Sequence, residues 1–206
     1  HRYPRLKAAA AGIAALVNHG VVEETNQYIG LKGLNLEEHF RRLVPIPMTV
    51  GNDMNFLTMG CWAQKHPDAG SLVTLFMGGN GIGGGMVING RLWTGASGYC
   101  SEVGFLPVYE RLNKGSLGLP PAEHISELYA RLIQIYAVTV NPHMMVLYRH
   151  PLLEGRLDEI RRLCASYLPS KAIPSIELSY DYQQDYEKGL FTVAKSMGQA
   201  VSEGAL

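Results

Sequence analysis

Two acidic side chains and a run of glycines are the residues of this sequence whose types and spacing could carry out chemistry. Asn52 and Asp53 follow a short apolar run, the glycine-rich segment is 79–85, and Glu102 comes after it. A carboxylate facing a glycine-rich anion-binding loop suits phosphoryl transfer to an alcohol, because the carboxylate accepts the hydroxyl proton while the loop holds the phosphates. A second carboxylate could accept hydrogen bonds from sugar hydroxyls.

The glycine-rich segment reads Gly-Asn-Gly-Ile-Gly-Gly-Gly and lies between two apolar runs, 71–77 and 86–88, which both read as strands. Glycine has no Cβ atom, so consecutive amides can face one concavity, and such a nest suits a phosphate or another anionic oxygen. The same residues also fit a glycine-rich β-hairpin without a ligand, because Asn-Gly is a strong hairpin signal by itself. The pattern alone leaves both alternatives open.

The elements that must position these residues alternate between strand and helix. We expect a helix at 36–43, with acidic residues in its first turn and basic residues in its last, while 8–17 fits either a buried strand or a small-residue helix. The other expected elements are a strand at 48–50, a helix at 54–64 capped by Asn52 or Asp53, a helix at 122–138, a strand at 144–148, a helix at 152–166, a strand at 176–179 and a closing helix at 186–201. This alternation indicates an α/β fold.

The composition narrows the class of protein. Eighteen basic residues balance eighteen acidic ones, so no net field recruits nucleic acid or an anionic membrane. The longest apolar stretch, 8–17, is too short to span a bilayer. Cys61, Cys100 and Cys164 lie far apart without a C-x-x-C pair, which favours reduced thiols in a cytoplasmic protein over a disulfide framework or a zinc site. The chain opens with His1 and not Met, which we interpret as a fragment or a processed chain.

Four segments in one order resemble the ROK family, the sugar kinases and sugar-responsive repressors built on the actin-like (ribonuclease H-like) ATPase fold. They are Val50-Gly-Asn-Asp-Met-Asn55, Gly79-Asn-Gly-Ile-Gly-Gly-Gly85, Gly90-Arg-Leu-Trp-Thr-Gly-Ala96 and Ser101-Glu-Val-Gly-Phe105. The resemblance implies an α/β fold of two lobes. Residues 1–68 would be the remainder of a small N-terminal lobe missing its first strands, 69–190 a large lobe with the glycine-rich loop, and 191–206 a closing helix.

The resemblance also implies roles for individual residues. Asp53 would be the general base on a sugar hydroxyl. The sugar ligands would be Asn52, Asp53, Gly95 and Glu102. The phosphate loop would use Gly79, Asn80, Gly81, Gly83 and Gly84. Each polar residue has a structural alternative, since Asn52 and Asp53 could simply cap the next helix and Glu102 could be a solvated loop charge.

Several departures from the family pattern affect the nucleotide side. The N-terminal Asp-x-Gly-Gly-Thr motif is absent, Asn80 stands where the kinases carry Thr, and Phe105 replaces a histidine that binds sugar and zinc. No cysteine-rich zinc motif appears in 109–121. Tyr148 and Arg149 stand where the family has Gly-Gly, and we expect their side chains to obstruct adenine or reshape its pocket.

These losses leave the sugar-side residues in place. The leading hypothesis is therefore a ROK-like sugar-binding protein, a carbohydrate-responsive transcriptional regulator with a degenerate kinase site. Its expected partners are a small-molecule sugar and a second copy in a homodimer, with DNA contact only through a segment outside this chain and no membrane contact. The alternative is an ATP-dependent kinase that phosphorylates a hexose or N-acyl-hexosamine hydroxyl, with ATP and Mg²⁺ as cofactors and Asp53 as general base. Zinc is not expected.

Three tyrosines near the C-terminus have two interpretations. Tyr180, Tyr182 and Tyr186 alternate with Asp181 and Asp185, which favours a turn that packs onto the last helix. An aromatic platform for a sugar is the less favoured alternative.

Overall fold

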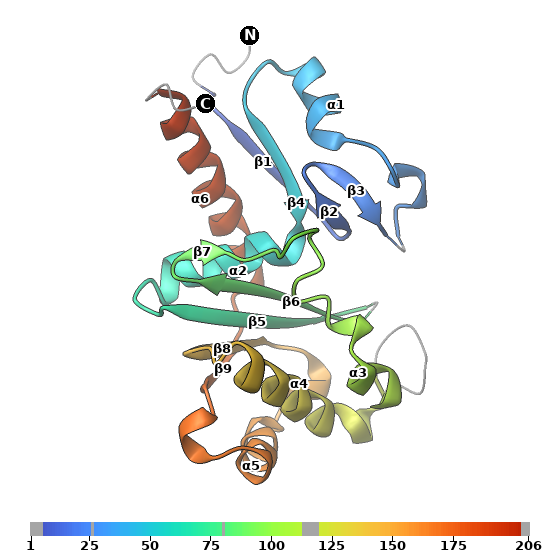
Figure 1. The fold of residues 1–206 in the computed structure, drawn as a ribbon, viewed down its shortest axis with the longest axis vertical. Coiled ribbons are helices and arrows are strands. Elements are labelled where there is room, and N and C mark those ends of the chain that lie inside the picture. The colour runs from blue at the N-terminus through green and yellow to red at the C-terminus, as the bar shows by residue number, and fades with distance from the viewer. Residues whose placement is uncertain (1–5, 26, 80, 113–119, 203–206) are drawn as a thin grey trace.

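A computed structural model describes residues 6–25, 27–79, 81–112 and 120–202. They form two β-sheet lobes, and helices α2 (Asp53–Lys65) and α6 (Tyr182–Ser202) pack against each other where the lobes meet (Figure 1). The α/β class is confirmed. Helix α6 runs from the large lobe up alongside the first strand of the small lobe (Figure 1).

The small lobe is built on a parallel pair of strands, β1 (Ala9–Ile13) and β4 (Met48–Asn52), with Ile13 opposite Asn52. Within the described part of the chain, β1 pairs with β4 alone. The segment 8–17 is therefore strand and not helix, and it turns into the hairpin formed by β2 (Leu16–Asn18) and β3 (Val21–Glu24).

Helix α1 (Leu36–Leu43) occupies the residues expected from the sequence. Its N-cap is Asn35, whose side-chain oxygen accepts a hydrogen bond from the Glu38 amide at 2.9 Å. A short 3₁₀ turn, Ile29–Leu31, lies between β3 and α1.

The large lobe contains a five-stranded sheet of order β7-β6-β5-β8-β9. Its strands are β5 (Ser71–Gly78), β6 (Gly81–Ile88), β7 (Arg91–Leu92), β8 (Met144–Tyr148) and β9 (Ser175–Ser179). Strands β5 and β6 form an antiparallel hairpin, whereas β8 pairs in parallel with both β5 and β9. Parallel strands need a long crossover connection, and the helices supply it here.

Helices cover both faces of this sheet. Helix α2 packs on one face, and α4 (Ile125–Thr139) packs on the other with α5 (Leu157–Tyr167) beyond it (Figure 1). Helix α3 (Pro107–Leu112) joins the sheet to α4. Short 3₁₀ turns are Val103–Phe105, Ala122–His124, Pro151–Leu153 and Ser170–Ala172.

Two helices begin at least four residues away from their predicted starts. The helix expected at 152–166 starts at Leu157, because Pro151–Leu153 forms a 3₁₀ turn and Gly155 takes a positive φ of 71°. The closing helix expected at 186–201 starts at Tyr182. The alternation of tyrosine and aspartate there looked like a turn, but Tyr182 and Tyr186 are spaced to share one face of a helix.

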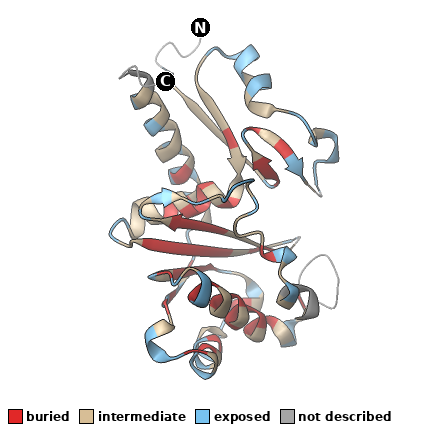
Figure 2. Cartoon of the chain, viewed as in Figure 1, coloured by how far each residue is buried: buried red, intermediate tan, exposed pale blue. Residues whose placement is uncertain are grey.

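The cores of the two lobes differ in size. Figure 2 shows that buried residues dominate the strands of the large lobe, where the core cluster extends from the sheet into α4 and α5. In the small lobe the buried cluster consists of Ala15, Val17 and Val22. Among the described helices, none combines the length and apolar character needed to cross a bilayer.

Helices α2 and α6 cross with their backbones in contact, and a glycine on each helix allows it. A Cβ atom on Gly60 would lie 1.7 Å from the Asp185 carbonyl oxygen, and one on Gly189 would lie 1.7 Å from the Phe56 carbonyl oxygen. Real Cβ atoms do not approach backbone so closely, so these positions require glycine.

Candidate functional site

The junction of β4 and α2 places Asn52 and Asp53 at the edge between the lobes. The Asn52 side-chain oxygen accepts a hydrogen bond from the Met54 amide at 2.8 Å, and Asp53 Oδ1 accepts from the same amide at 2.9 Å. The Asn52 Nδ2 donates to the Ala15 carbonyl oxygen at 3.0 Å. Asn52 is therefore the N-cap of α2, and Asp53 is the first residue of the helix and accepts the same amide. Asn52 also ties the start of α2 to the strands of the small lobe.

Capping does not use the whole Asp53 carboxylate. Its second oxygen, Oδ2, has no hydrogen-bond or ion-pair partner among the described residues, and the side chain is only half-buried. Burial raises the pKa of Asp53 above its ordinary value of 3.8, and the Met54 amide partly opposes this by stabilising the charge. The site therefore keeps a partly desolvated carboxylate with a free acceptor.

Glu102 is the second such carboxylate. It precedes the 3₁₀ turn Val103–Phe105, is half-buried, and makes no side-chain hydrogen bond or ion pair with any residue that the structure describes. Burial raises the pKa of Glu102 above 4.5, and the negative charge of Asp53 raises it further. The structure thus brings Asp53 and Glu102 close enough to affect each other, although they come from different lobes.

The loop that carries Glu102 rests against the small lobe. A Cβ atom on Gly98 would lie 3.0 Å from the Val17 carbonyl oxygen, so the loop touches β2. Gly95 takes a positive φ of 73° and packs beside Cys100. Gly95 therefore has a conformational role in the turn, and its predicted contact with sugar stays a prediction.

The glycine-rich segment forms a β-hairpin, with Gly78 opposite Gly81. At Gly79 a Cβ atom would meet nothing within 4 Å, and Gly81 takes a φ of 132°. Asn80 lies outside the described residues. An anion could therefore reach the backbone at the turn of this hairpin, and the phosphate-loop assignment of Gly79, Asn80 and Gly81 stays a prediction.

Farther along β6 the glycines have a packing role. A Cβ atom on Gly83 would lie 2.8 Å from the Met54 Cγ, and one on Gly85 would lie 2.0 Å from the Thr58 Oγ1. On the other face, Gly84 lies against Ser101, whose carbonyl oxygen would be 2.8 Å from such an atom. These glycines let α2 and the Glu102 loop approach the strand. The backbone at Gly83 and Gly84 is therefore covered by protein and not open to a ligand.

A row of three aromatic rings includes Tyr182 and Tyr186, for which a sugar platform is the less favoured interpretation of the sequence. Tyr182 stacks on Phe76 with ring centroids 4.4 Å apart, and Tyr186 lies nearly parallel to Tyr182, with an interplanar angle of 6° and centroids 6.2 Å apart. Burial raises the pKa of both tyrosines, and the charge of Asp53 raises them further, so both lie near this carboxylate. The four-residue spacing of the tyrosines was the signal that could have identified them.

Tyr148 points into the interior and joins a buried polar cluster. Its hydroxyl donates a hydrogen bond to Asp185 Oδ2 at 2.6 Å, and Lys65 Nζ lies 2.7 Å from the same oxygen and 3.1 Å from Asp181 Oδ2. Burial acts to lower the pKa of Lys65, but the hydrogen bonds to Asp185 and Asp181 outweigh it and raise the pKa. Arg149 is exposed and pairs with Glu154 at 2.6 Å.

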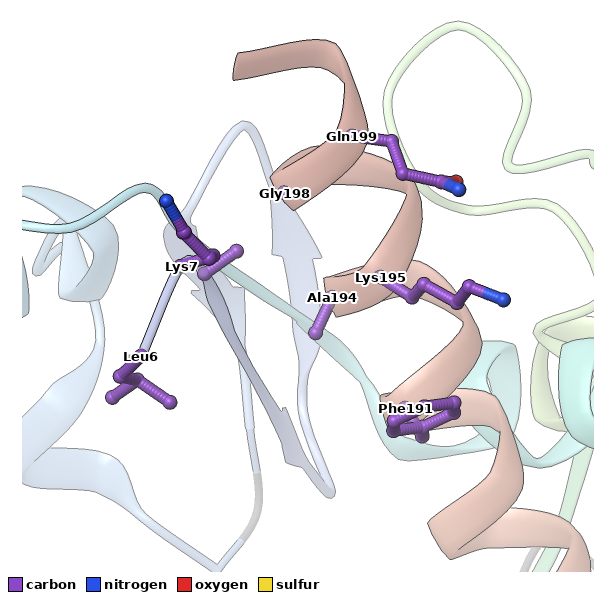
Figure 3. A pocket seen from close by; sticks show the side chains of 8 residues that line it. Leu6, Lys7, Phe191, Ala194, Lys195, Gly198 and Gln199 are labelled. Carbon is purple, nitrogen blue, oxygen red and sulfur yellow. The ribbon is translucent and has the colours of Figure 1, made fainter. Parts of the chain in front are cut away.

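A hollow of about 490 Å³ lies elsewhere, between the start of β1 and the outer face of α6 (Figure 3). It is lined by Leu6, Lys7, Ala8, Phe191, Ala194, Lys195, Gly198 and Gln199. The hollow lies at the start of β1. The last residue of β1, Ile13, pairs with Asn52, which directly precedes Asp53. The hollow and the Asp53 carboxylate therefore lie at opposite ends of β1. The hollow offers no acidic group to sugar hydroxyls, and we place the candidate site at Asp53 and Glu102.

Cys61, Cys100 and Cys164 are free thiols. No three histidine, cysteine, aspartate or glutamate side chains within residues 6–25, 27–79, 81–112 and 120–202 gather so that they could hold a metal ion.

Comparison with known proteins places this geometry in a family. The model of the ROK family matches residues 2–123. A glucokinase from Halalkalibacterium halodurans is 30% identical over 80 residues, which are 39% of this chain and 24% of that enzyme. The aligned part of the chain thus spans about a quarter of this relative.

Two solved structures share the fold. A ROK family transcriptional regulator, a homologue of the E. coli MLC protein, superposes with a TM-score of 0.72 at 17% identity, over 95% of this chain and 64% of that one. A ROK family protein from Streptococcus pneumoniae, in complex with sucrose, gives 0.69 at 16% identity, over 94% and 82%. The predicted actin-like fold is confirmed, and this chain belongs to the ROK family.

Proposed function

We propose that this chain binds a sugar at the junction of its lobes and acts as a carbohydrate-responsive transcriptional regulator with a degenerate kinase site. The observation that carries this proposal is the pair of half-buried carboxylates, Asp53 and Glu102, which no cation balances within the described residues. Ionised carboxylates accept several hydrogen bonds, and each bond to a charged group contributes about 1.5–3 kcal/mol. Sugar hydroxyls are donors of the right kind.

The position of the pair supports a regulatory role. Asp53 belongs to the end of the small lobe and Glu102 to a loop of the large lobe, so one sugar bonded to both would favour a closed arrangement. A ligand shifts a two-state equilibrium by its difference in affinity for the two states. In this proposal a cytoplasmic homodimer reports sugar to DNA through a segment outside this chain. The ROK regulator and the sucrose complex among its structural relatives support this choice.

The residues on the nucleotide side support the loss of kinase activity. Where the family pattern has Gly-Gly, Tyr148 fills the interior against Asp185 and Arg149 projects to the surface toward Glu154. Both side chains have protein partners of their own. An adenine base that needs bare backbone at these two positions would meet the side chains of Tyr148 and Arg149 instead.

An ATP-dependent sugar kinase is the second candidate, and the free Oδ2 of Asp53 favours it. A carboxylate with a raised pKa and an open acceptor suits a general base, which in this reading would accept the proton of a sugar hydroxyl. Glu102 would hold neighbouring hydroxyls. The hairpin turn at Gly79 has the open backbone to receive phosphates, and ATP with Mg²⁺ would supply the phosphoryl group.

Calorimetry with a panel of neutral hexoses and N-acyl-hexosamines tests sugar binding. We expect at least one sugar to bind, and Asp53→Ala to weaken it by roughly 10- to 150-fold, as the loss of a charged acceptor predicts. The matched control is Asp158→Asn, a carboxylate 89% exposed on α5, which should bind as the unmodified chain does. If no sugar in the panel binds, the proposal is wrong.

A coupled assay with ATP, Mg²⁺ and the same panel separates regulator from kinase. The regulator proposal predicts sugar binding without turnover. Turnover that Asp53→Asn abolishes would establish the kinase and overturn the proposed loss of catalysis. Thermal melts of each variant check that the fold is kept.

A further inference from the structure

Phe76, Tyr182 and Tyr186 form an aromatic row that begins near the glycine hairpin and ends near the strands that precede Asp53. Phe76 lies on β5, two residues before Gly78, where the glycine hairpin turns. Tyr182 stacks on Phe76, and Tyr186 follows one turn later on α6. Figure 1 shows how α6 begins at the large lobe and continues beside β1, which carries the row from one lobe to the other.

The far end of the row reaches the strands that lead to Asp53. The Tyr186 hydroxyl lies against Gly12, where a Cβ atom would come within 2.3 Å of the hydroxyl oxygen. Gly12 is the register partner of Gly51 on β4, two residues before Asp53. The aromatic row therefore runs from the strand that leads into the glycine hairpin to the strands that lead to Asp53, and a ligand bound at Asp53 would lie near it.

The chemistry of this row is selective. The face of an aromatic ring carries partial negative charge, so it repels an anion and attracts weakly positive C–H groups. All three rings are half-buried, and the Tyr182 hydroxyl has no hydrogen-bond partner within the described ranges. A polyphosphate beside Asp53 would meet a carboxylate and aromatic faces, whereas a neutral sugar ring presents C–H groups on its face and hydroxyls at its edge.

We propose that Tyr182 and Tyr186, supported by Phe76, form a stacking wall for the C–H face of a neutral pyranose ring. Asp53 and Glu102 then receive the hydroxyls at the edge of the same ring. The wall rests on the proposed sugar-binding function and adds the surface on which the apolar face of the sugar ring would stack. Pockets for small ligands commonly combine aromatic walls with a few polar groups in this way.

Ring-retaining and ring-removing substitutions test the wall by calorimetry with the tightest-binding sugar of the panel. Tyr182→Phe and Tyr186→Phe keep the rings, and we expect affinity within about threefold of the unmodified chain. Tyr182→Leu and Tyr186→Leu keep apolar volume and lose the ring, and each should weaken binding by roughly five- to tenfold. Tyr180→Leu is the matched control, since Tyr180 is 66% exposed and lies outside the row, and its affinity should not change.

The near-ultraviolet circular dichroism of the unmodified chain gives a second readout that needs no variant. Sugar that stacks on the tyrosines should change the tyrosine signal, and Tyr186→Leu should reduce that change. Leucine variants that bind sugar as tightly as the unmodified chain, with no sugar-dependent tyrosine signal, would overturn the wall and leave the sugar-binding proposal intact. An unmodified chain that binds no sugar would overturn both.

Discussion

Two aspartates near the contact of α2 and α6 differ in burial and in whether a cation balances their charge. Asp185 is 0% exposed, and its Oδ2 receives Lys65 at 2.7 Å and the Tyr148 hydroxyl at 2.6 Å, while its buried Oδ1 has no hydrogen-bond partner within the described residues. Asp53 is half-buried and receives the Met54 amide, while its Oδ2 has no partner in the described part of the chain. A buried carboxylate normally needs a cation and hydrogen bonds.

This difference separates a structural acid from the acid that we propose binds the ligand. The charge of Asp185 is used inside the protein, where it joins α6 to α2 and β8. The charge of Asp53 has no cation among the described residues, and burial raises its pKa because the charged form is partly desolvated. The comparison therefore predicts that the two acids respond to substitution with opposite signs of stability change.

Removal of the cation beside Asp185 should have the largest effect. Lys65→Met leaves a buried carboxylate without its cation, so we expect the free energy of unfolding to fall by about 3 kcal/mol. Urea denaturation measures it. Lys32→Met is the control, because Lys32 pairs with Glu24 at an exposed site and its loss should cost under about 1 kcal/mol. Equal losses in the two variants would mean that the buried pair has no special role.

A methyl group inserted at the helix crossing should have a smaller effect on the same region. Gly60→Ala would press a Cβ atom onto the Asp185 carbonyl oxygen, and overpacking of this kind costs about 1–3 kcal/mol. Gly30→Ala, where a Cβ atom meets nothing within 4 Å, serves as control and should change stability little. Thermal melts of both variants give the comparison, which fails if Gly60→Ala melts as the unmodified chain does.

Substitution at the unpartnered carboxylates should have the smallest effect and the opposite sign. The folded chain holds protons on Asp53 and Glu102 at higher pH than the unfolded chain does, because both pKa values are raised. The folded state therefore binds more protons between the ordinary and the raised pKa values, and stability falls as pH rises through that window. Asp53→Asn and Glu102→Gln remove this loss and should each stabilise the chain by roughly 0.5–1 kcal/mol at neutral pH.

The pH dependence of that gain is the measurement. Urea denaturation at neutral pH should show it, and it should shrink as the pH falls through the raised pKa values and vanish well below pH 3.8, where the carboxyls are protonated in both states. Asp158→Asn, at an exposed carboxylate that lies 3.3 Å from Arg161, should show no such gain. Destabilisation by Asp53→Asn at neutral pH would contradict the contrast between the two aspartates.

Local signals in the sequence predicted much of the site. The start of α2 at Asp53 follows from an apolar strand and a capping residue, and the hairpin of β5 and β6 follows from Asn-Gly between two apolar runs. These features depend on neighbouring residues, so a pattern can reveal them. The resemblance to the ROK family supplied the pairing of Asp53 with Glu102, which spacing alone does not contain.

The missed features depend on contacts between distant segments. Lys65 meets Asp185 only because α2 and α6 cross, and the glycines of β6 lie against α2 rather than in an open loop. A run of glycines looks the same in sequence whether a phosphate or a methionine covers it. The sequence places Tyr182 before the closing helix, because its stacking partner Phe76 lies on β5, far away in the sequence.

The glycine contact between α2 and α6 has a mechanical consequence. The backbones touch at Gly60 and Gly189, so no side chain lies between them that could change rotamer. We therefore expect the two helices to move together as one rigid unit. Helix α2 starts at Asp53, and the C-terminal part of α6 lies beside the start of β1. A pull of a fraction of an ångström at the carboxylate would therefore be transmitted to the far end of the small lobe.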